Sequence, residues 1–244
     1  MCDFRLIPLE WDSQYYGIPA AKLIIEKQTS IESWDLITES IQQYRFITIQ
    51  NKSDNAEFSR LISEELGAFL VDVNIQFTKS VINEAFKVRQ ENIEIVSNYE
   101  GNEDILRIAR DAFTYSRFYN DKNLEITKSK NIYMNWIKNS FYKFEKYFVL
   151  FEENDKKVGF ILFSHLDKHT VVIELIAVDN DIETKGIGTR MINSLQRYMQ
   201  DNEIANIKVG TQIENIKAIN FYIGNNFKVI EQTPIYHYWN KVNK

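Results

Sequence analysis

The chain has 244 residues, of which 44% are hydrophobic and 26% are charged, an ordinary composition for a globular protein of one or two domains. Its formal net charge is -5, so the basic surface expected of a nucleic-acid-binding protein is missing. One cysteine, no signal-peptide pattern and no apolar run long enough to span a membrane lead us to expect a cytoplasmic protein with no membrane partner.

The first third of the chain mixes strand-like and helix-like patterns. Strands are predicted at 21–26, 46–50 and 69–79, and helices at 31–44 and 55–66, the second of which ends before Gly67. Polarity rises at residues 89–94. We therefore divide the chain into an N-terminal α/β portion, residues 1–91, and a second domain, residues 92–244.

The second domain begins with helices and continues with strands. Helices are predicted at 103–115, 130–144, 189–200 and 215–223, and strands at 147–152, 158–164, 170–178, 206–211, 228–231 and 236–239. Helices that precede and interrupt a run of strands indicate an α/β or α+β sheet covered by helices. His165 and His169 fall around a turn between two of these strands, without a second cysteine or a carboxylate cluster, so we expect no metal site.

A glycine pair, Gly186 and Gly188, joins the apolar strand VVIELIAV to a helical pattern. Glycines at such a junction let backbone N–H groups converge on an anion at a helix N-terminus. Met191 stands where a dinucleotide-binding fingerprint needs its third glycine, and the Walker pattern is absent. The loop suits a pyrophosphate, although a glycine pair by itself is also typical of an ordinary turn.

A second motif lies at residues 215–223, with the sequence NIKAINFYI. Asn215 suits the start of a helix, and Gly224 or Asn225 suits its end. Residues 215, 218, 219 and 222 fall on one face. Taken by itself, this is a short amphipathic helix with Tyr222 in the core.

Together, in this order and at this separation, the two motifs resemble the GNAT superfamily of N-acetyltransferases. Its acetyl-CoA motif is a strand ending in valine, a loop of the form (Gln/Arg)-x-x-Gly-x-(Gly/Ala) and a helix, matched here by Val178, Gly186 and Gly188. Glu183 departs from this pattern, because the family prefers Gln or Arg there. The later motif, Asn-x-x-Ala-x-x-Phe-Tyr-x-x-x-x-Phe, is matched by Asn215, Ala218, Phe221, Tyr222 and Phe227.

The resemblance implies a GNAT fold, with a mixed, mostly antiparallel central sheet flanked by helices, here with an N-terminal α/β extension. It makes residues 92–244 the catalytic domain and acetyl-CoA the co-substrate. The residues implied to bind acetyl-CoA are Ala177, Val178, Lys185, Gly186, Ile187, Gly188, Thr189, Asn215 and Ala218.

Acetyl transfer needs an unprotonated amine, a polarised thioester carbonyl and a proton for the leaving thiolate. The resemblance implies that a backbone N–H of the strand carrying Ala177 and Val178 points at the thioester oxygen, and that Tyr222 is the general acid. A phenol with an ordinary pKa of about 10 can protonate a thiolate. Glu174, on the strand face of Val178, is a candidate base. An edge carboxylate at this position, with water as the base, is the alternative.

Four stretches outside these motifs indicate which amine accepts the acetyl group. They are LEWDSQYYG at 9–17, DAFTYSRFYND at 111–121, YMNWIKNS at 133–140 and YHYW at 236–239. Together they resemble the dTDP-fucosamine (TDP-4-amino-4,6-dideoxygalactose) N-acetyltransferases, which acetylate a nucleotide-linked amino sugar for bacterial surface glycans such as lipopolysaccharide. The resemblance then covers nearly the whole chain and assigns residues 1–91 to the acceptor side.

Four residues are the predicted acceptor contacts. Tyr16 and Phe118 would stack on thymine or line the sugar site, and Arg117 offers a planar fork for a diphosphate. Asp121 is the fourth. Phe118 is more typical of a core residue than of a ligand contact, whereas Arg117 and Asp121 are more informative, because charges are rarely buried without a partner.

Two other functions stay open. One is a GNAT enzyme for a different amine, such as an aminoglycoside or a protein N-terminus, which an acidic acceptor groove would favour. The other is a non-catalytic CoA-binding module, against which the intact Gly186, Gly188, Asn215 and Tyr222 argue. The expected partner is a small nucleotide sugar rather than nucleic acid, and the sequence leaves open whether the chain forms a homodimer.

Overall fold

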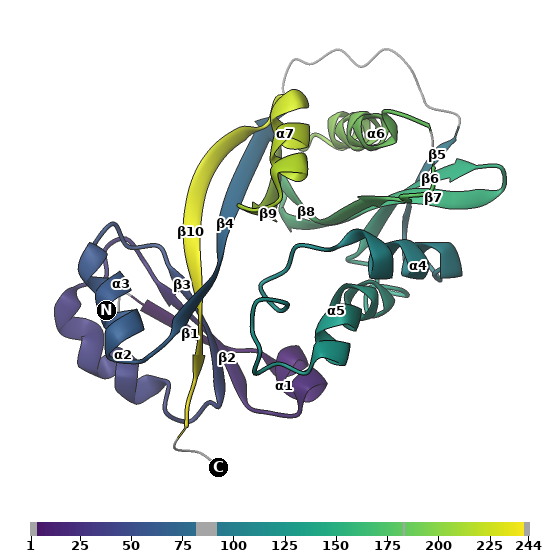
Figure 1. Ribbon diagram of the computed structural model, residues 1–244. Coiled ribbons are helices and arrows are strands. Elements are labelled where there is room, and N and C mark those ends of the chain that lie inside the picture. Colours follow the sequence, from purple (N-terminus) through teal and green to yellow (C-terminus); the bar gives the residue numbers. More distant parts are fainter. Residues whose placement is uncertain (1–3, 82–91, 183, 242–244) are drawn as a thin grey trace. The chain divides into compact units, whose positions relative to one another are not determined.

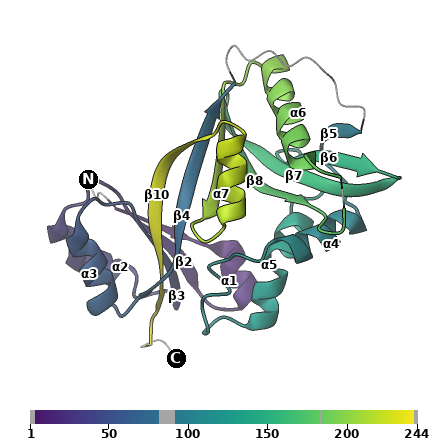
Figure 2. The same ribbon diagram turned by 45° about the horizontal axis from the view of Figure 1, so that its top comes forward.

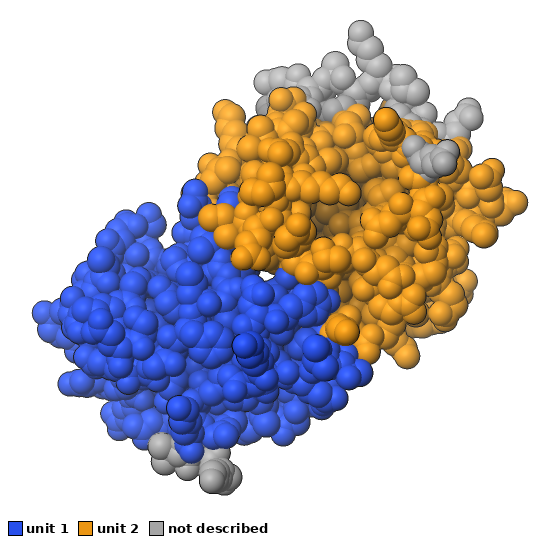
Figure 3. Space-filling model, in the orientation of Figure 1, with its two compact units in different colours: residues 1–75, 116–129, 232–244 blue, residues 76–115, 130–231 orange. Residues whose placement is uncertain are grey.

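The computed structural model describes residues 4–81, 92–182 and 184–241 (Figure 1). The chain forms two compact units, each discontinuous in sequence (Figure 3). Unit 1 comprises Met1–Ile75, Ser116–Ser129 and Gln232–Lys244, and unit 2 comprises Gln76–Tyr115 and Lys130–Glu231. The boundary expected near residue 91 lies outside the described residues and stays a prediction.

The sheet of unit 1 has the strand order β1-β2-β3-β10-β4. The strands are β1 (Phe4–Pro8), β2 (Ala20–Ile25), β3 (Phe46–Asn51), β10 (Lys228–Trp239) and β4 (Phe69–Ser80), of which β4 and β10 also contribute residues to unit 2. β2 runs parallel to β3, whereas β1 is antiparallel to β2 and β10 is antiparallel to β3.

One face of this sheet carries the apolar core of unit 1. Alternate residues of the strands, among them Leu23, Ile47 and Ile49, pack there with the helices α2 (Trp34–Ser40) and α3 (Ala56–Glu64). A single 3-10 turn (η1, Ile31–Ser33) precedes α2, so the helix expected at 31–44 is shorter than the pattern indicated.

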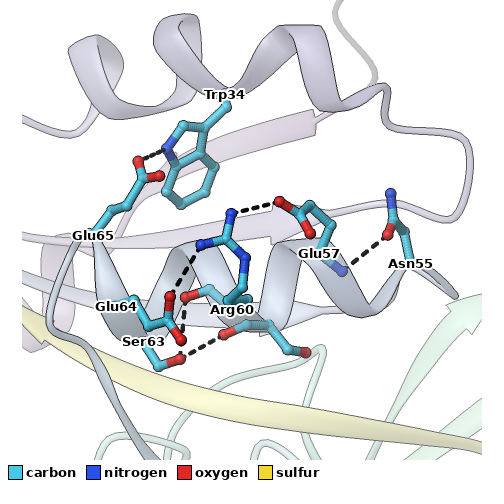
Figure 4. Close-up of polar contacts among 8 residues, drawn as sticks. Trp34, Asn55, Glu57, Arg60, Ser63, Glu64 and Glu65 are labelled. Atoms are coloured by element: carbon cyan, nitrogen blue, oxygen red, sulfur yellow. Dashed lines mark hydrogen bonds and ion pairs between the residues drawn. The ribbon is translucent and has the colours of Figure 1, made fainter.

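Polar contacts fix these two helices (Figure 4). The Trp34 indole N–H donates to the Glu65 carboxylate at 2.8 Å, and the Asn55 side chain caps α3 by accepting from the Glu57 N–H at 2.9 Å. Arg60 bridges Glu57 and Glu64 along the exposed side of α3.

The other face of the unit 1 sheet is covered by α1 (Glu10–Tyr16) and by the segment at residues 116–129. The Tyr15 hydroxyl donates to the Lys128 carbonyl at 2.7 Å, and the rings of Tyr16 and Phe118 lie 6.2 Å apart. The helix α1 ends at Gly17, whose φ of 75° is a left-handed conformation that glycine adopts without strain. This face carries most of the polar side chains discussed below.

Unit 2 has the strand order β4-β9-β8-β7-β6-β5. Its further strands are β5 (Ile93–Ser97), β6 (Tyr147–Glu153), β7 (Lys156–Asp167), β8 (Thr170–Val178) and β9 (Asn206–Gln212). The pairs from β5 to β8 are antiparallel, and β8 and β9 are parallel. The mixed, mostly antiparallel sheet predicted from the sequence is confirmed.

Helices cover both faces of the unit 2 sheet (Figures 1 and 2). α6 (Ile187–Asp201) lies on one face and α4 (Glu103–Ala112) on the other. α5 (Ile126–Lys138) runs from unit 1 into unit 2, and α7 (Ile216–Gly224) precedes β10. No helix in the described ranges is long and apolar enough to cross a membrane. Those ranges also hold no group of three or more His, Cys, Asp or Glu side chains suited to a metal ion.

Two strands predicted near the end of the chain, at 228–231 and 236–239, form the single strand β10. Pro234 lies between the two predicted segments, and proline cannot donate a hydrogen bond in a sheet. In the structure the pairing of β10 with β3 begins at Ile235, so Pro234 lies just outside this ladder.

Candidate active site

The N-terminus of α6 has the geometry of an anion site. Gly186 caps this helix with φ 82° and ψ 6°, and no side chain caps it by a hydrogen bond. A Cβ atom at Gly186 would meet nothing within 4 Å. The first N–H groups of a helix have no partner within the helix, so here they are available to an anion at the positive end of the helix dipole. Lys185 and Thr189 are exposed beside them, and Glu183 lies outside the described residues.

Gly188 brings the two sequence motifs into contact. A Cβ atom at this position would lie 3.0 Å and 3.1 Å from two ring carbons of Phe221. The absence of a side chain therefore lets the first turn of α6 approach α7 beside Tyr222.

Gly159 of β7 has a similar role that sequence reasoning missed. Its Cβ would lie 3.2 Å from side-chain carbons of Ile187 and Met191 and 3.4 Å from the Ala177 carbonyl oxygen. It thus lets α6 start close to the end of β8. A glycine inside an otherwise apolar strand pattern was the available signal.

β8 and β9 separate before either strand ends. Their parallel register covers Thr170–Ile173 of β8 and Asn206–Val209 of β9, whereas β8 continues to Val178 and β9 to Gln212. In a strand paired on one edge only, alternate residues direct their N–H and C=O groups away from the partner. The stretch of β8 that includes Ala177 and Val178 therefore offers backbone hydrogen-bonding groups to a ligand on the β9 side.

Tyr222 lies in α7, whose start and end are confirmed. The Asn215 side chain accepts from the Ala218 N–H at 3.0 Å, and Asn225 follows the last helical residue. Tyr222 is 3% exposed and its ring packs against Phe77 at 5.3 Å and Phe227 at 5.5 Å.

Burial raises the pKa of Tyr222 above its ordinary value, so the phenol stays protonated at neutral pH. A phenylalanine would keep the ring packing and lose only the phenolic proton, so Tyr222 remains the candidate general acid.

Glu174 is held by three donors. Ser164 Oγ donates to Oε1 at 2.6 Å, Lys146 forms an ion pair with Oε1, and the Trp136 indole N–H donates to Oε2 at 3.2 Å. The Glu174 side chain is 10% exposed. These contacts favour the structural alternative for Glu174, with water as the base.

Replacing Glu174 with glutamine should therefore destabilise unit 2 and change kcat by less than about tenfold, since it breaks a largely buried ion pair, worth about 1–3 kcal/mol. Urea unfolding and steady-state kinetics on the same preparation measure the two effects. Exposed Glu145, replaced by glutamine, is the matched control and should change neither. A fall in kcat of a hundredfold at unchanged stability would instead identify Glu174 as the base.

The four predicted acceptor residues all lie in unit 1, and three of them are in contact. The Arg117 Cζ atom stands 4.1 Å from the centroid of the Phe118 ring, which in turn neighbours the Tyr16 ring. The Nε atom of Arg117 is buried and has no hydrogen-bond partner in the described ranges.

Asp121 has its side-chain oxygens occupied by donors of the chain itself. Oδ2 accepts from His237 Nδ1 at 2.7 Å and from Trp239 Nε1 at 2.8 Å, and Oδ1 accepts from the Asn123 N–H at 2.9 Å. Burial by itself would raise the pKa of Asp121, but the hydrogen bonds from His237 and Trp239 outweigh it and lower that pKa. These contacts favour a positioning role for Asp121, which holds the fully buried His237.

The sequence profile of the acetyltransferase (GNAT) family matches residues 103–226, just over half of the 244 residues. The chain belongs to the GNAT acetyltransferase family. It thus has the GNAT fold, and this family of acetyltransferases uses acetyl-CoA as acetyl donor.

Among curated proteins, the chain is similar to the spore coat polysaccharide biosynthesis protein SpsD of Bacillus subtilis (strain 168), with 26% identity over 137 residues. The match covers 56% of this chain and 47% of that protein, so it spans about half of the length of the relative.

Among solved structures, a conserved protein of unknown function from Staphylococcus epidermidis ATCC 12228 has a TM-score of 0.67 at 15% identity, over 96% of this chain and 90% of that one. A GCN5-related N-acetyltransferase from Sphaerobacter thermophilus has a TM-score of 0.61 at 11% identity, over 98% and 77%. At these identities the likeness concerns the fold.

Proposed function

We propose that this GNAT acetyltransferase transfers the acetyl group of acetyl-CoA to the amine of a nucleotide-linked amino sugar, a dTDP-4-amino-4,6-dideoxyhexose, in the cytoplasm. The observation that carries the proposal is Arg117, a half-buried guanidinium that lies on an aromatic ring and has no ion pair among the described residues. Such a group suits the diphosphate of a nucleotide sugar better than a cationic acceptor. The similarity to a polysaccharide biosynthesis protein supports the same class of substrate.

The residues of unit 2 fit acetyl-CoA. The N–H groups at the start of α6, from Ile187 to Thr189, would hold the pyrophosphate, and the unpaired edge of β8 at Ala177 and Val178 would bind the pantetheine arm and the thioester oxygen. Bound acetyl-CoA supplies the thioester. Tyr222 would give its phenolic proton to the departing thiolate sulfur.

In unit 1, Phe118 and Tyr16 would bind the base or the sugar ring, and Arg117 would bind the diphosphate oxygens. Asp121 would act through His237 and Trp239 rather than by contact with the sugar.

The test is a thiol-release assay with acetyl-CoA and a panel of amines, followed by mass analysis of the products. The panel contains dTDP-amino sugars with the amine at C3 or C4, the corresponding free amino sugars, an aminoglycoside and a peptide with a free N-terminus. We expect acetylated product from a dTDP-amino sugar and at least tenfold lower kcat/KM for the free sugar, because the free sugar lacks the diphosphate. Equal activity on the two, or a preference for the aminoglycoside or the peptide, would overturn the proposal.

A further inference from the structure

Three polar side chains form a row across neighbouring strands of unit 1. Thr48 of β3 lies opposite Lys22 of β2 and opposite His237 of β10. Residues directly opposite one another in a sheet point to the same face. Their neighbours in sequence, such as Ile47 and Ile49, belong to the apolar core on the other face. Lys22, Thr48 and His237 therefore stand side by side on the face that α1 and residues 116–129 cover.

Arg117 lies over this row. The Phe118 ring is 6.4 Å from the His237 ring, and Arg117 stacks on Phe118. Arg117 is also close enough to act on the charges of both Lys22 and His237. We call Lys22, Thr48, Arg117 and His237 the unit 1 cluster.

Three buried polar atoms of the unit 1 cluster lack a hydrogen-bond partner in the described ranges. They are Thr48 Oγ1, Arg117 Nε and His237 Nε2. Thr48 is 2% exposed and His237 is 0% exposed. Buried polar atoms are nearly always hydrogen-bonded, because leaving them unpaired costs free energy. Three such atoms in one cluster require partners that the chain itself does not supply, either ordered water or a bound group.

The charges of the unit 1 cluster point to an anion. Lys22 and Arg117 are both half-buried, and neither forms an ion pair with a residue that the structure describes. Burial, and next the proximity of Arg117, lower the pKa of Lys22, and Arg5 and Lys52 act in the same direction. Asp12 is the carboxylate that opposes them, and burial raises its own pKa. An anion would relieve the repulsion between the two cations.

His237 adds a requirement for a hydrogen-bond donor. Burial, together with the nearby Arg117, lowers the pKa of His237 in spite of the hydrogen bond to Asp121, so the ring is neutral at pH 7. Its Nδ1 proton is directed to the Asp121 carboxylate, which leaves Nε2 as an acceptor. The unit 1 cluster thus suits an anion with a neighbouring hydroxyl.

We propose that Lys22, Thr48, Arg117 and His237 form the binding site for the diphosphate of a nucleotide sugar and for an adjoining sugar hydroxyl. Arg117 and Lys22 would bind phosphate oxygens, Thr48 would donate its hydroxyl proton to one of them, and His237 Nε2 would accept from the sugar hydroxyl. The choice of a nucleotide sugar rests on the proposed function, whereas the preference for an anion rests on the unit 1 cluster itself.

The experiment is isothermal titration calorimetry of the full chain with thymidine diphosphate, and separately with pyrophosphate. Saturating CoA is present throughout, so that the loop at Gly186 is occupied. The variants are Lys22→Gln and Arg117→Gln. The matched control is Lys27→Gln, which removes a lysine with a 69% exposed side chain from the same unit. Thermal melting of each variant without ligand reports on its fold.

We expect Kd for thymidine diphosphate to rise at least about tenfold in Lys22→Gln and in Arg117→Gln, and to stay unchanged in Lys27→Gln. Without ligand, Lys22→Gln should melt no lower than the wild type, because it removes one of two like charges. An unchanged Kd in both cluster variants, or an equal loss in Lys27→Gln, would overturn the inference.

The binding and transfer experiments separate this inference from the proposed function. If thymidine diphosphate fails to bind the wild-type chain while a dTDP-amino sugar is still acetylated, the inference is wrong and the proposed function stands. If cluster-dependent binding is measured but no nucleotide amino sugar is acetylated, the binding site stands and the proposed function is wrong.

Discussion

Replacing Tyr222 with phenylalanine should lower kcat by about a hundredfold or more, with little change in the KM for acetyl-CoA. The substitution removes only the phenolic hydroxyl of Tyr222, the group that carries the proton. The ring contacts with Phe77 and Phe227 remain. The melting temperature should therefore stay within a degree or two of the wild type, or rise slightly. Single-turnover kinetics, which isolate the chemical step from product release, provide the cleanest measurement.

The burial of Tyr222 also determines how the activity of the wild type depends on pH. A general acid works in its protonated form, so activity that depends on it is lost as pH rises through its pKa. Because burial raises the pKa of Tyr222 above its ordinary value, this loss should not begin below about pH 10. The Tyr222→Phe defect should accordingly be the same at pH 7 and at pH 9.

Tyr198→Phe is the matched control. Tyr198 belongs to α6 of the same unit, its hydroxyl lies 3.4 Å from His165 Nε2, and it is not among the residues implied to bind acetyl-CoA. Its removal should leave kcat unchanged. An unchanged kcat with a raised KM in Tyr222→Phe would show that Tyr222 contributes to acetyl-CoA binding by packing and is not the acid.

The motifs of unit 2 were predictable because each is local in sequence. The cap of α7 by Asn215 and the start of α6 at Gly186 depend on residues within one or two turns, and propensities act on that scale. What the motifs could not show is that Gly188 meets Phe221, or that β8 and β9 separate after Ile173. Both depend on the packing of elements far apart in the chain.

Unit 1 was less predictable for the same physical reason. Its sheet combines strands from both ends of the chain, and residues 116–129 join it from the middle. Lys22, Thr48 and His237 are unremarkable in the sequence and become neighbours only through the register of β2, β3 and β10. Arg117 was singled out from the sequence because its planar guanidinium suits a diphosphate and because charges are rarely buried without a partner, but its unpaired Nε atom is a property of the folded chain.

Small elements were missed because their sequence signal is weak. β1 and β5 have five residues each and α1 has seven, too short for periodicity to distinguish them from loops. Because α1 was not predicted, the sequence did not show that this helix places Tyr16 and Asp12 on the polar face of unit 1.

Replacing Gly186 with aspartate should weaken the binding of CoA at least about tenfold, while asparagine at the same position should weaken it much less. The φ of 82° at Gly186 lies in the left-handed region, which Asp and Asn tolerate better than other residues with a side chain. Both are also strong helix N-cap residues, and a Cβ atom there meets nothing within 4 Å. The two variants should therefore be equally stable, and they differ in one negative charge placed where the pyrophosphate would bind.

Calorimetric titration with CoA at low and high salt measures this difference. A contribution from charge repulsion should shrink as the ionic strength rises, because salt screens exposed charges, whereas a steric contribution common to both variants should not. Equal affinities of Gly186→Asp and the wild type would mean that no anion binds at the start of α6. Equal and large losses in both variants would mean that the backbone needs the space in front of Gly186 and that the charge of the ligand lies elsewhere.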